Sequence, residues 1–448
     1  MTPTVNEELT WGNTPSKELL KISLPIAVSM LSYSAMTLVD TIFVGRLGTE
    51  ALAGVGLAGV LAFTLTSFGY GLLRAVKILV SQARGAGQDE HIGPFIAAGL
   101  WVSMLLGFFW VFASRLIADP LSSLAAGVES GQAASLYFSI RMLASPFVLG
   151  FAATKEGRYG IGDTKSAMFS SIGANVVNIG LDYLFIVILE WGVAGAAWAS
   201  VAASFVQFAM LAVFSGFHGW TYLAAGRKKI KSIIKIGVPT GFQFVLEMSS
   251  FLIVTMILAK ISDLDMAAHQ IVIQVIHFGF LPFVAVAEGA SVMAGQAVGA
   301  GLFDWVGRVS KRAFVFVVIY GTLFASVLFL FPEFLSSLFT KDPELISISM
   351  TLMFIAGVFQ IFDGVSIVSR GVLRGVGDVR TVAVIGVVLT WCTIPPLTWF
   401  LGKSCGLGAK GAWLGITAEV LVGSFIFSHR LLSKRWQGAA RETLKELN

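Results

Sequence analysis

Three polar side chains inside apolar segments are the first residues of this sequence that could bind a ligand. Asp40 lies in "TLVDTIFVG" (residues 37–45), and Asn178 and Asp182 lie in "GANVVNIGLDYLF" (residues 173–185). In a helix, residues four apart share one face, so Asn178 and Asp182 point the same way. If these segments cross a membrane, each buried charge costs about 3 kcal/mol, and an acid retained there is a candidate functional residue.

Carboxylate, amide and hydroxyl oxygens are the ligands that hard cations prefer. Two neighbouring carboxylates also form a proton site, because like charges disfavour the state in which both are ionised. Ser200, in "GVAGAAWAS", would add a hydroxyl to the same group. The sequence therefore predicts a cation or proton site formed by Asp40, Asn178, Asp182 and Ser200, with Na⁺ as the metal that the first three could bind. These residues leave the choice between Na⁺ and H⁺ open.

Four further acids lie in apolar segments of the second half of the chain: Glu247, Glu288, Asp363 and Glu419. Each of them is a candidate functional residue, and Glu247 and Asp363 lie in "FQFVLEMSSF" and "FQIFDGVS". For each acid the alternative is a place near a helix end or next to a partner of opposite charge.

Arg74 and Lys77, in "YGLLRAVKILV", are basic residues in an apolar segment. Their long side chains could reach the membrane surface. Arg74 could instead pair with Glu156, or with Glu288 at the equivalent place 214 residues later, or face a cavity and favour an anionic ligand. The sequence leaves these interpretations open.

The composition indicates a membrane protein. Of the 448 residues, 56% are hydrophobic and 13% are charged, about half of the charged fraction of a typical soluble domain. This excludes a soluble enzyme and a nucleic-acid binder. Two cysteines, Cys392 and Cys405, argue against a disulfide framework. The N-terminus lacks the pattern of a cleaved signal, so we expect a cytosolic lead-in there.

Twelve segments reach the length of about 20 apolar residues that a membrane helix needs. They are residues 22–45, 53–80, 94–117, 132–154, 166–189, 193–216, 236–260, 266–298, 312–331, 346–370, 381–401 and 410–430. Lys and Arg collect in the connections after the even-numbered segments, including "GRKKIK" (226–231) and Arg370, and in the C-terminal tail. Because basic residues mark the cytosolic side, both termini are predicted to lie in the cytosol.

Short motifs recur at a spacing of 214 or 215 residues. Pro25 recurs as Pro239, and "SQARGAG" (81–87) recurs as "GQAVGAG" (295–301). Two parallel six-helix repeats are therefore predicted, an architecture in which transporters bind substrate between the halves. A duplicated channel or a membrane enzyme is the alternative, but no metal motif, helical His pair or nucleophile elbow predicts catalytic residues. The predicted parts are a lead-in (1–21), an N-lobe with helices 1–6 (22–220), a basic cytosolic linker (221–235), a C-lobe with helices 7–12 (236–432) and a cytosolic tail (433–448).

The segment "LPIAVSMLSYSAMTLVDTIFVGRLGTEALAGVGLAG" resembles the first span and loop of the multidrug and toxic compound extrusion (MATE) transporters. "GIGDTK", "GVAGAAWAS", "GQAVGA" and "GVLRGVGD" resemble further segments of that family, in the same order. The resemblance covers nearly the whole chain and is to the prokaryotic NorM and DinF types. It implies two six-helix lobes around a central cleft, and export of amphipathic, commonly cationic compounds driven by inward flow of H⁺ or Na⁺.

The resemblance also implies roles for residues. Asp40 matches the acid in the first span of the N-lobe cation site, and Asn178, Asp182 and Ser200 match its companions. Glu247 and Asp363 match the C-lobe acids of NorM-like members, which implies a second cation or proton site there, whereas DinF-like members rely on the N-lobe. The N-lobe and the C-lobe acids are both present, so the sequence does not decide between the NorM-like and the DinF-like branch of the family.

The predicted mechanism is alternating access in which ion binding at Asp40 bends the first span at Pro25, where a backbone hydrogen bond is missing. Tyr33, Met36 and Thr37 lie on the same helix face and are predicted to contact substrate, with core packing as the alternative. A flippase for lipid-linked oligosaccharide, an exporter of anionic metabolites and a channel are the other interpretations. We expect small drug-like substrates, a bilayer of the inner membrane, a monomer, no nucleic acid, and no cofactor besides the coupling ion.

Overall fold

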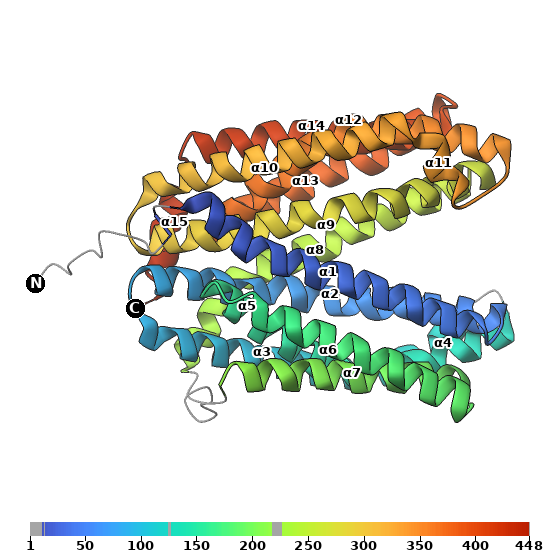
Figure 1. Cartoon of the computed structure of the whole chain (residues 1–448), viewed down its shortest axis with the longest axis horizontal. Coiled ribbons are helices and arrows are strands. Elements are labelled where there is room, and N and C mark those ends of the chain that lie inside the picture. The colour runs from blue at the N-terminus through green and yellow to red at the C-terminus, as the bar shows by residue number, and fades with distance from the viewer. Residues whose placement is uncertain (1–10, 13, 124–126, 217–225, 448) are drawn as a thin grey trace, which may run out of the picture. The chain divides into compact units, whose positions relative to one another are not determined.

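The computed structural model describes residues 11–12, 14–123, 127–216 and 226–447. Every regular element in this part of the chain is helical, and twelve helical segments are long and apolar enough to cross a membrane (Figure 1). They comprise α1 (Pro15–Gly45), α2 (Thr49–Gly85), α3 (Ile92–Ser122), α4 with α5 (Val128–Arg141, Ser145–Gly160), α6 (Lys165–Asp182), α7 (Gly192–Phe214), α8 (Arg227–Ala259), α9 (Asp263–Gly299), α10 (Phe303–Leu330), α12 (Pro343–Gly375), α13 (Val379–Leu397) and α14 (Gly408–Leu432). Two short helices, α11 (Pro332–Ser337) and α15 (Gln437–Leu444), complete the set. The predicted fold class, an all-α polytopic membrane protein, is confirmed.

Several helices extend beyond the predicted spans. α8 begins at Arg227 rather than at residue 236, so the basic run "GRKKIK" supplies its first turn and lies on a helix rather than in a loop. Lys and Arg are good helix formers, so a helix can continue through them. Hydropathy marks the part of a helix that lies inside the membrane rather than the residue at which the helix ends. Parts of the predicted lead-in, linker and tail (residues 1–10, 13, 221–225 and 448) lie outside the described residues.

The chain divides into two compact units. The N-terminal unit comprises residues 28–80 and 88–241, and the C-terminal unit comprises residues 1–27, 81–87 and 242–448. α1 contributes to both, since its first part belongs to the C-terminal unit and its remainder to the N-terminal unit. The predicted lobe boundaries stay predictions.

Two turns at equivalent places of the repeat precede α6 and α13. Gly162 and Gly377 have φ angles of 87° and 97°, in the left-handed region where glycine has no steric penalty. The acid after each glycine binds an arginine, Asp163 to Arg158 and Asp378 to Arg430. The two halves thus share this turn, although Arg158 precedes its acid by five residues whereas Arg430 comes from α14.

The Asp163 carboxylate is held at the start of α6. Its partial burial favours the neutral acid, but hydrogen bonds outweigh this effect and lower its pKa. Ser166 donates from its backbone nitrogen at 3.2 Å and from Oγ at 2.6 Å, and Arg158 donates from Nε at 2.8 Å. The turn "GIGDTK" is therefore stabilised by a charged cap.

α12 is the central helix of the C-terminal unit and packs against α9, α10 and α14. Two glycines one turn apart, Gly371 and Gly375, face the backbone of α9. A Cβ added at Gly375 would overlap the carbonyl oxygen of Ser291. Small residues at this spacing let membrane helices approach closely, which strengthens their packing.

We expect Gly375→Ala to reduce the free energy of unfolding by about 1–3 kcal/mol, because the backbones of α9 and α12 must separate to admit the methyl group. Unfolding of the purified protein in detergent measures this. Gly307→Ala in α10 is the matched control, because a Cβ there meets nothing within 4 Å. An equal loss in both variants would contradict the close approach.

Candidate functional site

The acids of the predicted N-lobe site come together in the N-terminal unit. Asp40 on α1 and Asp182 at the end of α6 lie within reach of a side-chain hydrogen bond. Because an ionised carboxylate has no proton to donate, such a bond forms only when one of the two acids is protonated. The chain after Asp182 continues as a π-helix over residues 183–188, a local widening that is frequent at functional sites.

Several polar atoms of this cluster are buried with no hydrogen-bond partner among the residues that the structure describes. They are Asp40 Oδ1, Asp182 Oδ2 and both polar atoms of the Asn178 amide. Asn178 is fully buried and Asp182 is 1% exposed. About nine in ten buried polar groups in proteins are hydrogen-bonded, so a group of unsatisfied oxygens at one place is unusual. Such a group suits the binding of a cation or of a hydrated proton.

Ser200 on α7 is linked to the cluster through a tyrosine. A hydrogen bond joins it to Tyr137 on α4, and the charge of Asp40 acts on Tyr137. Arg141, one turn after Tyr137, exerts an attractive electrostatic effect on Asp40. Sequence reasoning missed both residues, although the signal was available, since Tyr137 and Arg141 stand four apart inside an apolar segment.

The predicted hinge and substrate residues lie on the same helix. Pro25 is buried within α1, which continues unbroken past it. Tyr33 and Thr37 are exposed, and Met36 is half-buried. Thr37 Oγ1 donates to the Tyr33 carbonyl at 3.1 Å, so this hydroxyl is partly satisfied within the helix. Their roles in substrate contact stay predictions.

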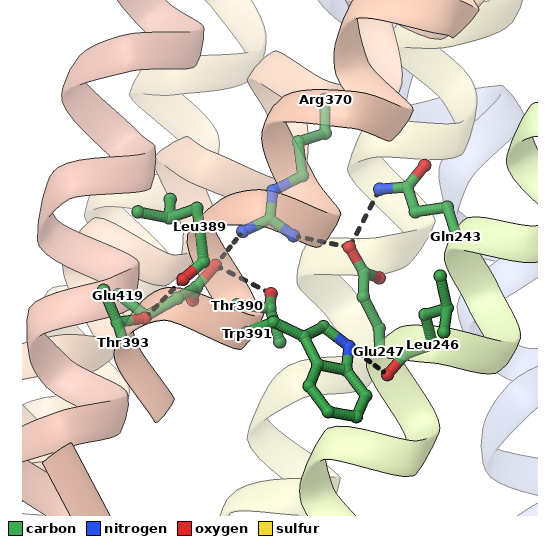
Figure 2. A network of polar contacts seen from close by, with 9 residues as sticks. All are labelled: Gln243, Leu246, Glu247, Arg370, Leu389, Thr390, Trp391, Thr393 and Glu419. Carbon is green, nitrogen blue, oxygen red and sulfur yellow. Dashed lines mark hydrogen bonds and ion pairs between the residues drawn. The ribbon is translucent and has the colours of Figure 1, made fainter. Parts of the chain in front are cut away.

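Two acids of the C-terminal unit, Glu247 and Glu419, flank an arginine (Figure 2). Arg370 on α12 donates from Nη2 to Glu419 on α14 at 3.0 Å and from Nη1 to Glu247 on α8 at 3.5 Å. Asp363, two turns earlier on α12, interacts electrostatically with the same guanidinium. Whether Glu247 and Asp363 also bind a cation stays a prediction.

The assignment of Arg370 to a basic cytosolic connection is corrected by this geometry. Its side chain is 16% exposed and lies between two carboxylates inside the helical part of the C-terminal unit. A guanidinium buried in this way is compensated only by such partners, which hydropathy cannot reveal because they come from other helices. The contact with Arg370 also accounts for Glu419. The alternative interpretation of this acid, that it lies next to a partner of opposite charge, is confirmed.

A second buried ion pair lies in the N-terminal unit. Lys77 Nζ is 3.8 Å from Glu156 Oε2, and both side chains are more than nine-tenths buried. Lys155 approaches the other oxygen of Glu156 at 3.4 Å. The intramembrane lysine of α2 is therefore paired within its unit rather than extended to the surface.

Comparisons with known proteins agree with this architecture. The protein-family model MatE matches residues 25–184 and 239–399, two stretches that begin 214 residues apart. The chain is 29% identical over 440 residues to a probable multidrug resistance protein NorM from Bradyrhizobium diazoefficiens, covering 94% of both chains. It is 27% identical to multidrug and toxin extrusion protein 1 from Danio rerio, over 95% of this chain and 74% of that one.

Solved structures show the same fold. A transporter of the MOP superfamily from Pyrococcus furiosus has a TM-score of 0.87 at 20% identity, over 95% of this chain and 97% of that one. A MATE protein solved in a straight and in a bent conformation also has TM-scores of 0.87 at 20% identity, over 96% of this chain and 97% of that one.

Proposed function

Because the chain belongs to the MatE family of multi-pass membrane transporters, we propose that it is a secondary active antiporter that exports amphipathic, cationic small molecules in exchange for H⁺ or Na⁺. The names of the matched NorM relatives, which are probable multidrug resistance proteins, support this class of cargo. The observation that carries the proposal is the buried group of unpartnered oxygens at Asp40, Asn178 and Asp182.

The coupling step is the exchange of a monovalent cation at this group. One proton between Asp40 and Asp182 leaves the pair with a single negative charge, which Na⁺ or a second proton can neutralise. A fully charged pair is costly inside the membrane, so occupation by a cation changes the stability of the helix arrangement. This difference in free energy is what an ion gradient can use.

The conformational step is a bend of α1 near Pro25. The proline lacks the N–H of a helical hydrogen bond, which lowers the cost of bending. The division between the two compact units crosses α1 after Ala27, two residues beyond Pro25. A neighbour with the same fold exists in straight and bent conformations, which is consistent with a change of this kind.

The cargo is proposed to contact the exposed face of α1 near Asp40. Tyr33 offers an aromatic ring to an amphipathic cation, and Met36 and Thr37 complete the face. Because ion and cargo would both contact α1, binding of one would oppose binding of the other. The flippase alternative requires a wide cationic cavity, to which Arg74 and Lys77 would contribute, and the pairing of Lys77 with Glu156 weakens it.

The proposed setting is the inner membrane, with both termini in the cytosol and the transporter working as a monomer. The Lys- and Arg-rich connections support this orientation. No cofactor and no nucleic acid is required by the proposed cycle.

Efflux from proteoliposomes tests the proposal and identifies the ion. Purified protein is reconstituted with a lipophilic cationic dye, the membrane potential is clamped, and a pH gradient and a Na⁺ gradient are imposed separately. We expect one of the two gradients to drive the dye against its own gradient. Dye movement that is equal with and without both gradients would indicate a channel or a facilitator, and transport of only an anionic dye would reverse the proposed charge of the cargo.

A further inference from the structure

Arg370 occupies the centre of the acids in the C-terminal unit. Its guanidinium reaches a carboxylate with each of its terminal nitrogens, Glu247 at 3.5 Å and Glu419 at 3.0 Å, and acts electrostatically on Asp363. Glu247 comes from α8 and Glu419 from α14, so Arg370 on α12 stands where three helices of the unit meet (Figure 2). An inorganic cation bound by these acids would have to take this place.

The acceptor oxygens next to Arg370 are also bound by neutral donors. Glu247 Oε1 accepts from Gln243 Nε2 at 2.8 Å as well as from Arg370. Glu419 Oε1 accepts from Thr390 Oγ1 at 3.4 Å as well as from Arg370. Each of these oxygens therefore has two donors, which matches its two lone pairs. In the N-terminal unit, by contrast, Asp40 and Asp182 each keep a buried oxygen that no residue in the described part of the chain binds.

The guanidinium is held in this place by its surroundings. It lies over the Phe427 ring, 4.9 Å from the ring centre, in a cation–π contact. Gly423, one turn earlier on α14, also lies beside the guanidinium, since a Cβ there would be in ordinary van der Waals contact with Nη2 at 3.4 Å. The Arg370 and Glu247 side chains are each 16% exposed.

We propose that Arg370 acts as a tethered cation that takes the place of a coupling ion among Glu247, Asp363 and Glu419. The proposal rests on the proposed antiport function and replaces the sequence prediction of an ion site at Glu247 and Asp363. A positive charge within about 4–6 Å weakens binding of a second cation by about one to three powers of ten. The coupling ion then binds only at Asp40 and its neighbours, and the C-lobe acids serve as a permanent link between α8, α12 and α14.

Arg370→Gln tests the proposal, because it removes the charge and keeps a polar side chain. We expect the purified variant to bind one more monovalent cation than the parent protein, with an affinity at least about tenfold higher than any binding at this place in the parent. Bound ²²Na⁺ and proton uptake are both measured, since the freed carboxylates accept either ion. Arg370→Lys keeps the positive charge and should bind no additional cation.

Glu247→Gln provides the second test and does not depend on folding of the Arg370→Gln variant. In the otherwise unchanged protein it should leave the number of bound cations and the ion-to-dye ratio unaltered, and combined with Arg370→Gln it should weaken or remove the additional cation. Loss of a bound cation in Glu247→Gln alone, or no additional cation in Arg370→Gln, would overturn the proposal. Asp40→Asn tests the proposed function separately, since cation binding that survives it refutes the N-lobe site whatever the Arg370 variants show.

Discussion

Replacing Asp40 by asparagine is expected to reduce gradient-driven efflux by at least about tenfold, because the cluster loses the negative charge that favours binding of the coupling cation. The amide keeps the size of the side chain but cannot share a proton with Asp182 or balance a bound Na⁺. Dye efflux and ion uptake are measured in the same proteoliposomes, so that the loss of coupling is seen in both. Downhill dye exchange should be reduced less than uphill transport.

Asp119→Asn is the matched control for this prediction. It makes the same chemical change at an exposed position on α3, in the same compact unit, and should leave efflux and ion uptake unaltered. If Asp40→Asn retains ion-driven efflux with the parental ratio of ion to dye, the cluster of Asp40, Asn178 and Asp182 does not couple transport.

Arg430→Gln is expected to be the most damaging of the stability variants, with a loss of about 3 kcal/mol in the free energy of unfolding. Asp378 is 1% exposed and accepts from Arg430 Nε at 2.5 Å and Nη2 at 3.1 Å. Arg430 also donates to Thr381 Oγ1 at 3.1 Å. Removing the guanidinium leaves a buried carboxylate without its charged partner, and unfolding in detergent measures the cost.

The equivalent change in the first repeat, Arg158→Gln, is a control with a smaller expected effect. Asp163 has a side chain that is 25% exposed and keeps two hydrogen bonds from Ser166, so the loss should be about 1 kcal/mol or less. Equal losses in the two variants would show that burial of the acid does not determine the strength of these pairs.

Hydropathy was sufficient to predict the fold class, because a membrane span must satisfy its own backbone hydrogen bonds and is therefore a local helix. The twelve predicted segments all lie on observed helices, and the spacing between Pro25 and Pro239 is also the spacing between the two matches of the family model. The helix ends were less predictable. α8 begins nine residues before the predicted span, since charged residues continue a helix outside the apolar region.

The sequence by itself determined that acids such as Asp40 and Glu247 stand in apolar helices, where their cost marks them as candidates for function. Only the tertiary structure decided which charges meet. Arg370 lies 123 residues from Glu247 and 49 from Glu419, and Arg141 acts on Asp40 from another helix. Such contacts depend on how each helix is rotated and packed against its neighbours, and no local pattern of residues encodes that rotation. The same kind of acid is therefore left with an unpartnered oxygen in one unit and neutralised by an arginine in the other.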